Sequence, residues 1–427
     1  MIKILHYGEV SNEQIFARAV PEVDVVKVVT DIIKDVRKRG DEALLEYTKR
    51  FDRAQLSSLQ VTQEEMDAAL QEVDPAFISL LERAAANIRK FHSQQKRSSF
   101  IINDEPGIVI GQKIIPVDRA GLYVPGGTAS YPSTVLMDAI PAKIAGCPEV
   151  VMVSPPDRSG KIAPVILAAA KVAGVDRIYK VGGAQAIAAL AYGTQTIPKV
   201  DKIVGPGNAF VAEAKKQVYG KVSIDMIAGP SEILVIADEN SDPRFVAADL
   251  LSQAEHDKLA CAVLVTPSES LAKKVQQELE RQLPLLEREE IARASIDNNG
   301  KIIVTQSVAQ AIDIANAIAP EHLELCVDAP FDYLDSIRHA GSVFMGRNCP
   351  EALGDYFAGP NHTLPTSGTA RFSSPLGVDD FIKKTQYTYY TREALARVAG
   401  DVAAFAGAEG LTAHAKSALI RTEDDSK

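Results

Sequence analysis

Short β-branched runs alternate with alanine-rich segments through residues 121–327, and this rhythm constrains the fold more than any other feature of the chain. Val150-Val-Met-Val-Ser precedes a helical pattern over 164–172, and the same alternation resumes after Gly229-Pro230-Ser231. Glycine or proline bounds each run, as expected where helical crossovers join parallel strands. The sequence therefore predicts an α/β protein with two Rossmann-like parallel-sheet lobes in series, joined near residue 229.

The segments outside this rhythm have another character. Residues 25–51 and 66–91 carry apolar side chains at helical spacing among charged ones, which is typical of surface helices laid on a core. Residues 108–117 alternate like a strand pair, and residues 395–417 are mostly helical. Residues 354–376 are rich in glycine, proline, serine and threonine, so we interpret them as a functional loop or a linker. We therefore expect small helical N- and C-terminal extensions to the two lobes.

The charge balance argues against two classes of partner. The chain has 46 Lys and Arg residues against 56 Asp and Glu residues, which gives a formal net charge of −10. Nucleic acids and anionic membranes both require a cationic surface, so we expect neither as a partner. No apolar run approaches the ~18 residues of a membrane helix, and the N-terminus lacks the apolar core of a signal peptide. A cytoplasmic location is expected.

The four cysteines point to a reducing compartment. Cys147, Cys261, Cys326 and Cys349 form no C-x-x-C pair and lie in or beside apolar runs. This usage is typical of buried, unpaired thiols. Cys326 is the one whose reactivity merits a test, because it follows Glu321-His322 closely in the chain.

One group of polar residues suits a metal ion. Gln253 and His256 lie three residues apart in a predicted helix, so their side chains project from one face. With Asp355 from the loop and His414 from the tail, they would supply two imidazole nitrogens and two oxygens. This donor set suits a borderline divalent cation such as zinc. A helix-end polar pair, with His256 at the favourable C-terminal end of the helix dipole, is an alternative that the spacing leaves open.

Glu321-His322 is an adjacent pair of titratable residues that follows Pro320. Neighbouring side chains in a strand point to opposite faces, so the two could share a site only at a strand end or turn. A histidine there suits a general base, and a nearby glutamate could activate water. A solvated joint between a helix and a strand is the alternative.

Three glycine-containing loops are placed where strands meet helices. Gly205-Pro-Gly-Asn-Ala-Phe210 approaches the dinucleotide fingerprint G-x-G-x-x-G, and Asp225 follows twenty residues after its first glycine. Phe210 replaces the third glycine, however, so the signal is weak. The loops Tyr123-Val-Pro-Gly-Gly and Val181-Gly-Gly-Ala-Gln185 could present backbone N–H groups to an anion or could be plain tight turns.

Taken together, these segments resemble one family, the histidinol dehydrogenases, over nearly the whole chain. The segments that carry the resemblance occur in the family's order and are long and unusual: Gly121-Leu-Tyr-Val-Pro-Gly-Gly, Val181-Gly-Gly-Ala-Gln-Ala-Ile, Gly205-Pro-Gly-Asn, Ala228-Gly-Pro-Ser-Glu, Leu251-Ser-Gln-Ala-Glu-His, Ala319-Pro-Glu-His-Leu, Gly354-Asp-Tyr and Leu411-Thr-Ala-His.

The resemblance implies a role for each matching residue. The implied zinc ligands are Gln253, His256, Asp355 and His414, and the implied catalytic pair is Glu321 and His322. The implied substrate contacts are Ser231, Gln253, His256, His322, Asp355, His362, Glu409 and His414. The implied NAD contacts are Tyr123, Gln185 and Asn208, without a standard Rossmann fingerprint.

The activity that the resemblance implies is the four-electron oxidation of L-histidinol to L-histidine through L-histidinaldehyde, the last steps of histidine biosynthesis. One zinc ion per subunit and two NAD molecules per turnover are implied. So is an intertwined homodimer with shared active sites, in which the partner subunit contributes the C-terminal histidine ligand.

We divide the chain accordingly. Residues 1–20 are an N-terminal extension, residues 21–120 with 231–370 a discontinuous catalytic lobe, residues 121–230 the lobe on the NAD side, and residues 371–427 a small C-terminal domain that supplies a metal ligand. Two other functions compete with this interpretation. A zinc hydrolase would use Glu321 or His322 to activate water without a dinucleotide, and a two-lobed binding protein would have no turnover.

Overall fold

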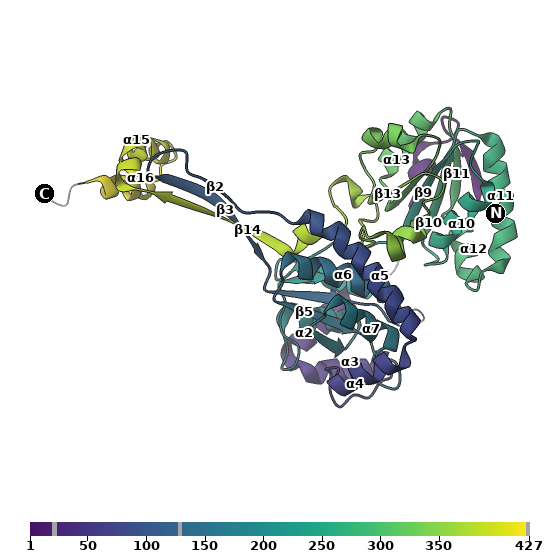
Figure 1. The fold of residues 1–427 in the computed structure, drawn as a ribbon, viewed down its shortest axis with the longest axis horizontal. Coiled ribbons are helices and arrows are strands. Elements are labelled where there is room, and N and C mark those ends of the chain that lie inside the picture. Colours follow the sequence, from purple (N-terminus) through teal and green to yellow (C-terminus); the bar gives the residue numbers. More distant parts are fainter. Residues whose placement is uncertain (19–23, 127–129, 424–427) are drawn as a thin grey trace. The chain divides into compact units, whose positions relative to one another are not determined.

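The structure is a computed structural model that describes residues 1–18, 24–126 and 130–423. The chain divides into two compact units, the first formed by residues 1–95 and 117–381 and the second by residues 96–116 and 382–427. Two parallel sheets with helices around them make up the first unit (Figure 1). This architecture confirms the predicted α/β fold with two parallel-sheet lobes.

The larger sheet has six parallel strands in the order β1-β11-β10-β9-β12-β13. In that order they are Lys3–His6, Lys301–Val304, Cys261–Thr266, Glu232–Ala237, His322–Cys326 and Ser342–Met345. The helices of this lobe are α1 (Asn12–Phe16), α10 (Pro243–Ala254), α11 (Glu269–Gln282), α12 (Glu289–Asn298), α13 (Val308–Ile318) and α14 (Glu351–Leu353). The N-terminal residues, expected as a helical extension, therefore contribute an edge strand, β1, to this sheet.

Both faces of the six-stranded sheet are covered, because alternate residues of its strands point to opposite sides. In β9, Ile233 and Val235 pack in the cluster that contains side chains of α10, α11 and α12. Leu234 and Ile236 pack on the other face, in the cluster that contains side chains of α13. The uninterrupted apolar run of this strand in the sequence follows from burial on two faces.

The smaller sheet has five parallel strands in the order β6-β5-β4-β7-β8. In that order they are Arg177–Lys180, Glu149–Ser154, Arg119–Tyr123, Lys202–Val204 and Ser223–Ile224. The helices around it are α2 (Val26–Arg39), α3 (Asp41–Phe51), α4 (Gln63–Glu72), α5 (Pro75–His92), α6 (Pro132–Ala145), α7 (Pro164–Ala173), α8 (Gly183–Tyr192) and α9 (Ala209–Val218). The chain leaves this sheet at Ile224 and enters the six-stranded sheet at Glu232, where the sequence predicts a join.

Helices α2 to α5 form because each presents an apolar stripe to the core. In α2 the stripe consists of Val29, Ile32, Ile33 and Val36, all buried. Side chains of α2 and α3 pack with α8 and α9 on one face of the five-stranded sheet, and α5 packs with α6 and α7 on the other. The predicted domain boundaries stay a prediction, but these helices, which we group with residues 231–370, pack on the five-stranded sheet.

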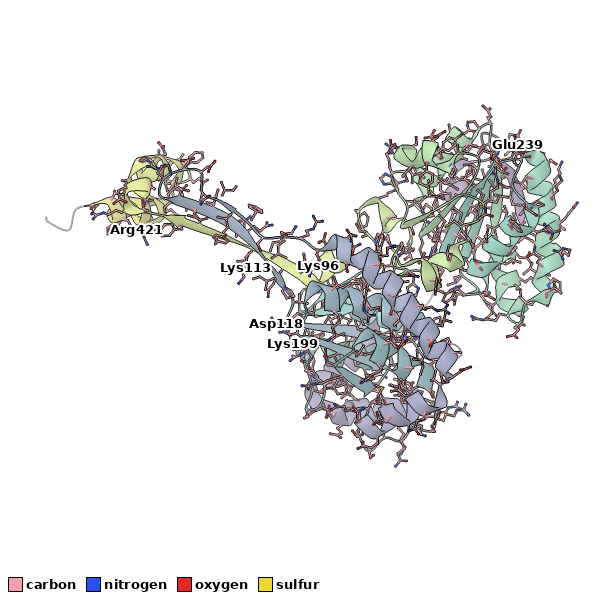
Figure 2. All side chains as sticks on the ribbon, viewed as in Figure 1. Lys96, Lys113, Asp118, Lys199, Glu239 and Arg421 are labelled. Atoms are coloured by element: carbon pink, nitrogen blue, oxygen red, sulfur yellow. The ribbon has the colours of Figure 1, made fainter. Side chains whose placement is uncertain are left out.

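The second unit is an antiparallel sheet with two helices. Its strand order is β14-β3-β2, with bounds Ile382–Tyr390, Ile108–Pro116 and Phe100–Ile102. The helices are α15 (Arg392–Ala408) and α16 (Thr412–Leu419). Residues 108–116 form one long strand rather than the predicted pair, and their partner β14 comes from near the C-terminus. Charged side chains, among them Lys96, Lys113 and Arg421, lie on the surface of this unit (Figure 2).

All four cysteines are free thiols, as their spacing predicts. Within residues 1–18, 24–126 and 130–423, no helix has both the length and the apolar character that crossing a membrane requires.

Candidate active site

Glu321 and His322 lie at the amino-terminal end of β12. Helix α13 ends at Ile318, and its C-cap residue Ala319 has a left-handed φ of 52° and is followed by Pro320. His322 is the first residue of the strand and pairs with Ile233 of β9 and Ser342 of β13. Because Glu321 precedes the strand, the two side chains need not alternate, and a Glu321 oxygen lies 3.6 Å from Nδ1 of His322. The pair therefore occupies the strand end that a shared site requires.

The hydrogen bond of His322 determines which ring nitrogen carries the proton. Nδ1 lies 2.9 Å from the backbone oxygen of Glu232, and a carbonyl can only accept, so Nδ1 is the donor. Nε2 is buried and has no hydrogen-bond partner within the described part of the chain. Burial lowers the pKa of His322. The ring is therefore neutral, with a free lone pair on Nε2.

Glu321 is held by the same residue of β9. The backbone N–H of Glu232 donates to Oε2 of Glu321 at 2.8 Å. Burial raises the pKa of the Glu321 carboxyl well above its usual range, and the carboxylates of Glu232 and Glu351 raise it further. Glu232 thus contacts both members of the pair through its backbone.

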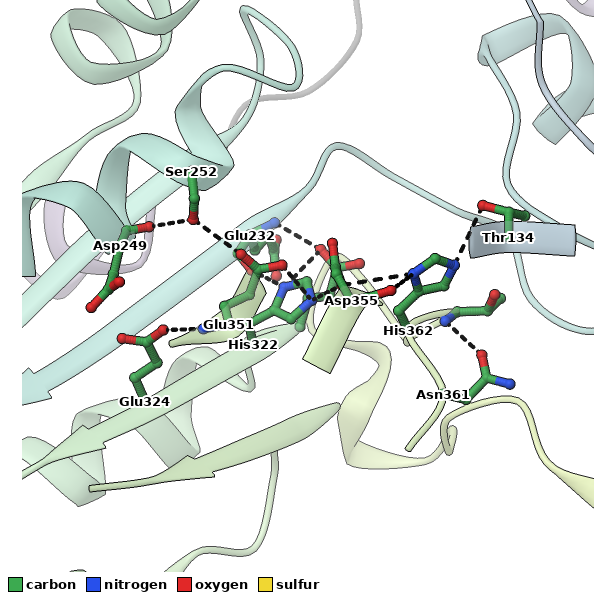
Figure 3. A network of polar contacts seen from close by, with 12 residues as sticks. Thr134, Glu232, Asp249, Ser252, His322, Glu324, Glu351, Asp355, Asn361 and His362 are labelled. Carbon is green, nitrogen blue, oxygen red and sulfur yellow. Dashed lines mark hydrogen bonds and ion pairs between the residues drawn. The ribbon is translucent and has the colours of Figure 1, made fainter. Parts of the chain in front are cut away.

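Two further carboxyl groups face His322 from the segment after β13 (Figure 3). Glu351 begins α14, and Asp355 lies in the single turn of π-helix, η4 (Gly354–Ala358). Each has an oxygen 3.9 Å from Nε2 of His322, and one ligand atom from each of the three residues lies within 4.8 Å of the other two. Residues 354–376, predicted as a functional loop or linker, thus begin with a helical turn, and π-turns are frequent at functional sites.

The pKa values of the two acids shift in opposite directions. Burial raises the pKa of Asp355 well above its usual range, and the adjacent Glu351 carboxylate adds to the shift. Burial acts on Glu351 in the same direction, but the protonated form of His322 and hydrogen bonds with Asp355 and Ser252 act against burial, so the pKa of Glu351 is lowered.

Glu351 does not figure in our sequence-based site. Its one signal in the sequence is its position four residues before Asp355, a spacing that places two side chains on one helical face. Ser252 donates a hydrogen bond to Oε2 of Glu351 at 3.0 Å and so holds the carboxyl group in the site. Oε1 of Glu351 is buried without a partner among the described residues.

Gln253 and His256 approach the same cluster from the end of α10. Gln253 is buried, and its Oε1 has no partner within the residues that the structure describes. His256 is half-buried in the turn after the helix, where its N–H donates to the Gln253 carbonyl at 3.1 Å. His256 lies close enough to His322 and Glu351 for an electrostatic interaction with each of them.

This donor set fits a divalent cation. Gln253 Oε1, Glu351 Oε1 and His322 Nε2 are buried acceptors without a partner among the described residues. In the described ranges, neither Glu351 nor Asp355 pairs with a lysine or arginine, although both are largely buried. Buried charges are normally paired or coordinate a metal, and oxygen with imidazole nitrogen suits zinc.

His362 joins this site to helix α6. Its Nδ1 donates to the backbone oxygen of Asp355 at 3.0 Å, and its Nε2 accepts from the Thr134 hydroxyl at 3.4 Å (Figure 3). Burial lowers the pKa of His362 to about 4. The neighbouring Asn361 donates to the Met137 carbonyl, and Thr363 donates to Asp138 at 2.9 Å. One face of α6 therefore holds the loop that carries His362.

The remaining substrate candidates are divided between the units. Ser231 is half-buried directly before β9, next to the Glu232 that contacts the catalytic pair. Glu409 and His414 belong to the second unit, where both are exposed. Their part in the site stays a prediction.

The three residues expected at the cofactor lie near the carboxyl ends of the five-stranded sheet. Tyr123 ends β4 and accepts a hydrogen bond from the Gly183 N–H at 3.1 Å. Gln185 is buried in the first turn of α8, and the Asn208 side chain caps α9 by accepting from the backbone N–H groups of Phe210 and Val211. Ligands of open α/β sheets bind at this edge, where helices begin. Gly127, the last residue of the segment Tyr123-Val-Pro-Gly-Gly, lies outside the described residues.

Asp225 does not take the place of a ribose-binding acid. Its side chain is buried and forms an ion pair with Lys215. It also accepts from the backbone N–H of Gly205 at 2.8 Å, while Lys215 donates to the Gly205 carbonyl at 2.9 Å. Asp225 therefore holds the Gly205 loop in place through Lys215 and the Gly205 N–H. Its spacing of twenty residues from Gly205 reflects this structural role.

Fold and site together define an α/β enzyme with a buried acid–base pair, and the comparisons with known proteins narrow the class. Residues 17–422 match the family described as histidinol dehydrogenase. A histidinol dehydrogenase of Clostridium acetobutylicum is 54% identical over 426 residues, covering 99% of each chain, and one of Syntrophotalea carbinolica is 56% identical over 406 residues, covering 95% and 94%. The solved histidinol dehydrogenase of Elizabethkingia anophelis superposes with a TM-score of 0.94 at 41% identity, covering 98% of each chain. The chain belongs to the histidinol dehydrogenase family and is an oxidoreductase.

Proposed function

We propose that this enzyme oxidises L-histidinol to L-histidine through L-histidinaldehyde, with zinc bound once per subunit and two NAD molecules reduced per turnover. The relatives named histidinol dehydrogenase, which align over nearly their whole length, support the substrate. The observation that carries the chemistry is the buried, unpartnered Nε2 of His322 beside Glu321, Glu351 and Asp355. A cytoplasmic role in the last steps of histidine biosynthesis accompanies this activity.

Gln253, His256 and Asp355, together with His414 from the partner subunit of a homodimer, would hold the zinc. The buried Oε1 of Gln253, which has no partner among the described residues, supports that assignment. Bound zinc would hold the imidazole and amino group of the substrate, which orients the alcohol carbon for reaction. Ser231, His362 and Glu409 would complete the substrate contacts, again with residues of both subunits.

The first oxidation removes a hydride and a proton from the alcohol. NAD, held by Tyr123, Gln185 and Asn208, would accept a hydride in each of the two oxidations. Nε2 of His322 accepts the hydroxyl proton as the C–H bond breaks and the C=O bond forms. The tautomer supports this role, because Nδ1–H is occupied by the Glu232 carbonyl and leaves Nε2 as the acceptor.

The second oxidation begins with water and the aldehyde. Glu321 takes a proton from water as the water oxygen bonds to the aldehyde carbon, and His322 returns the proton from the first oxidation to the aldehyde oxygen, which yields the hydrate and frees Nε2 again. The raised pKa makes its carboxylate a stronger proton acceptor than usual. One Glu321 oxygen is occupied by the Glu232 N–H, which leaves the other for water. His322 then accepts a hydroxyl proton of the hydrate as the second hydride leaves, and the carboxylic acid forms.

Substitution of His322 by Asn tests this proposal. The Asn side chain can still donate to the Glu232 carbonyl, but it offers no base, so we expect the rate of NAD reduction by L-histidinol to fall by roughly 10²–10⁴-fold. Zinc content measured by elemental analysis should equal that of the wild-type enzyme, because His322 is a base and not a ligand. Loss of zinc from the variant would contradict that role, and absence of histidinol turnover by zinc-loaded wild-type enzyme would contradict the function.

A further inference from the structure

The backbone of Glu232 contacts the side chains of both catalytic residues. Its N–H donates to Oε2 of Glu321 at 2.8 Å, and its carbonyl accepts from Nδ1 of His322 at 2.9 Å. The position of residue 232 therefore determines where the Glu321 carboxyl lies and which tautomer His322 adopts. Any residue that fixes the position of Glu232 therefore also fixes the positions of Glu321 and His322.

The side chain of Glu232 is buried and is held by an arginine from the N-terminal segment. Oε1 of Glu232 lies 3.2 Å from Nε of Arg18, while the Glu232 side chain is 9% exposed and that of Arg18 26%. Burial raises the pKa of Glu232, and Arg18 opposes that shift. Without the guanidinium, a carboxylate at the start of β9 would be buried without a countercharge.

The Arg18 guanidinium also contacts the backbone at the end of α13, directly before the catalytic pair. Nη2 of Arg18 donates to the carbonyl of Ile318 and lies 3.5 Å from that of Ala319, the residue directly before Pro320. A cation at the C-terminal carbonyls of a helix is favourably placed in the helix dipole, so Arg18 also stabilises the end of α13. Arg18 thus fixes the backbone immediately before Glu321 and, through Glu232, the groups that the pair contacts.

The segment that carries Arg18 is itself anchored. Buried Lys301 donates to the carbonyls of Ile15 and Ala17 at 3.1 and 2.8 Å. A side chain added at Gly368, whose φ is 78°, would collide with the Arg18 guanidinium. The loop that contains Gly368 therefore also packs against Arg18. Residues 15–18 therefore form a fixed support for the guanidinium.

We propose that Arg18 is a positioning residue for the catalytic pair and that it acts through Glu232 and the end of α13. The N-terminal segment then belongs to the machinery of the reaction without touching substrate. This inference rests on the proposed function for its kinetic test, but its structural test is independent of turnover.

The strand that carries Glu232 offers a matched control. Asp238 follows the other end of β9 and is bound by Arg347 at 2.5 and 2.7 Å. The exposure of that pair, 25% for Arg347 and 11% for Asp238, matches that of Arg18 and Glu232. Loss of either arginine leaves a largely buried carboxylate unpaired, but only Arg18 lies at the end of the strand that contacts the catalytic pair.

The experiment compares Arg18→Gln with Arg347→Gln in the zinc-loaded, full-length enzyme. We expect Arg18→Gln to lower kcat for L-histidinol by roughly 10–100-fold with little change in KM, because small displacements of catalytic groups cost rates of this order. Arg347→Gln should lose a comparable amount of thermal stability and keep its kcat. Equal losses of kcat in both variants, in proportion to the lost folded protein, would overturn the proposal.

Charge rescue and the tautomer of His322 provide two further readouts. The double variant Arg18→Gln with Glu232→Gln should recover part of the lost kcat, because it removes the unpaired buried charge; Arg18→Lys should recover less than wild-type activity, because an ammonium cannot span both contacts. NMR of isotope-labelled histidine should show that Arg18→Gln weakens the Nδ1–H preference of His322. An unchanged tautomer together with unchanged kcat would overturn the proposal. If wild-type enzyme fails to oxidise L-histidinol, the proposed function fails, while the tautomer still tests Arg18.

Discussion

Burial shapes the protonation of the individual residues of the site. It lowers the pKa of both His322 and His362, so both rings are neutral where free histidine would be partly charged. It raises the pKa of Glu321 and Asp355, which turns ordinary carboxylates into stronger proton acceptors. The neutral ring of His322 can therefore accept the hydroxyl proton of the alcohol, and the more basic carboxylate of Glu321 can accept a proton from water.

Asp138 is a buried acid outside this group, and its substitution by Asn tests the effect of burial on stability. Burial and the nearby Asp225 raise its pKa to about 8, although Thr363 and Lys215 act against the shift. Between the unfolded value of about 4 and this folded value, the native state binds a proton that the unfolded chain does not. The free energy of unfolding should therefore fall as pH rises through this window.

We expect Asp138→Asn to remove that decline and to raise the free energy of unfolding at about pH 8 by at least about 1 kcal/mol. Urea denaturation at about pH 5 and about pH 8 measures it, with exposed Asp31→Asn on α2 as the control. A variant whose pH dependence equals that of the wild-type enzyme would show that Asp138 is ionised in the folded protein.

At the scale of elements, the sequence predicts those helices and strands whose apolar residues recur at a regular spacing. Helix α7 begins at the predicted residue 164 and ends one residue after the predicted residue 172, because an alanine-rich pattern between two β-branched runs is a strong signal. Strand β14 is missed, since eight of its nine residues are exposed and no alternation marks a buried face. Amphipathic α2 to α5 are predicted as helices, but an apolar stripe does not reveal which sheet it covers.

The candidate site shows the same division. The Glu321-His322 pair and the Gln253-His256 pair are visible in the sequence because their members are neighbours or lie at helical spacing. Glu351 is a single acid without a distinctive sequence motif around it, so neither the family resemblance nor residue spacing identifies it as a site residue. The contribution of Glu232 is made by its backbone, and a backbone contact leaves no residue type to recognise.

Gly205 links β7 to α9 in the loop expected to approach the dinucleotide, and Gly205→Ala tests that element. Its φ is 111°, and an added Cβ would collide with the backbone oxygen of Tyr123. We expect the free energy of unfolding to fall by about 1–3 kcal/mol and NAD to bind more weakly. Urea denaturation and NAD titration measure the two effects.

Gly400, inside α15, is the matched control. A Cβ there would meet nothing within 4 Å, so Gly400→Ala should raise stability by roughly 0.5–1 kcal/mol. If alanine at position 205 leaves both stability and NAD affinity unchanged, the close approach of this loop to β4 is not what determines its conformation.

At the scale of the whole molecule, the proposed homodimer makes a prediction about mixed subunits. His256 belongs to the first unit and His414 to the second, and we propose that each zinc site takes these two ligands from different subunits. His256→Ala and His414→Ala should each lose zinc and activity. After subunit exchange, half of the dimers are mixed and each has one intact site, so about a quarter of the sites should recover. Recovery of neither zinc nor turnover would place both ligands in one subunit.

The central claim, a zinc-dependent four-electron oxidation, is tested most directly by the number of NADH molecules formed for each L-histidinol consumed, with and without a zinc chelator. We predict two NADH per L-histidinol from the zinc-loaded enzyme, no NADH after chelation, and full recovery when zinc is restored. One NADH per substrate would contradict the second oxidation by Glu321 and His322, turnover that survives removal of zinc would contradict the metal site, and no NADH from the zinc-loaded enzyme would contradict the substrate.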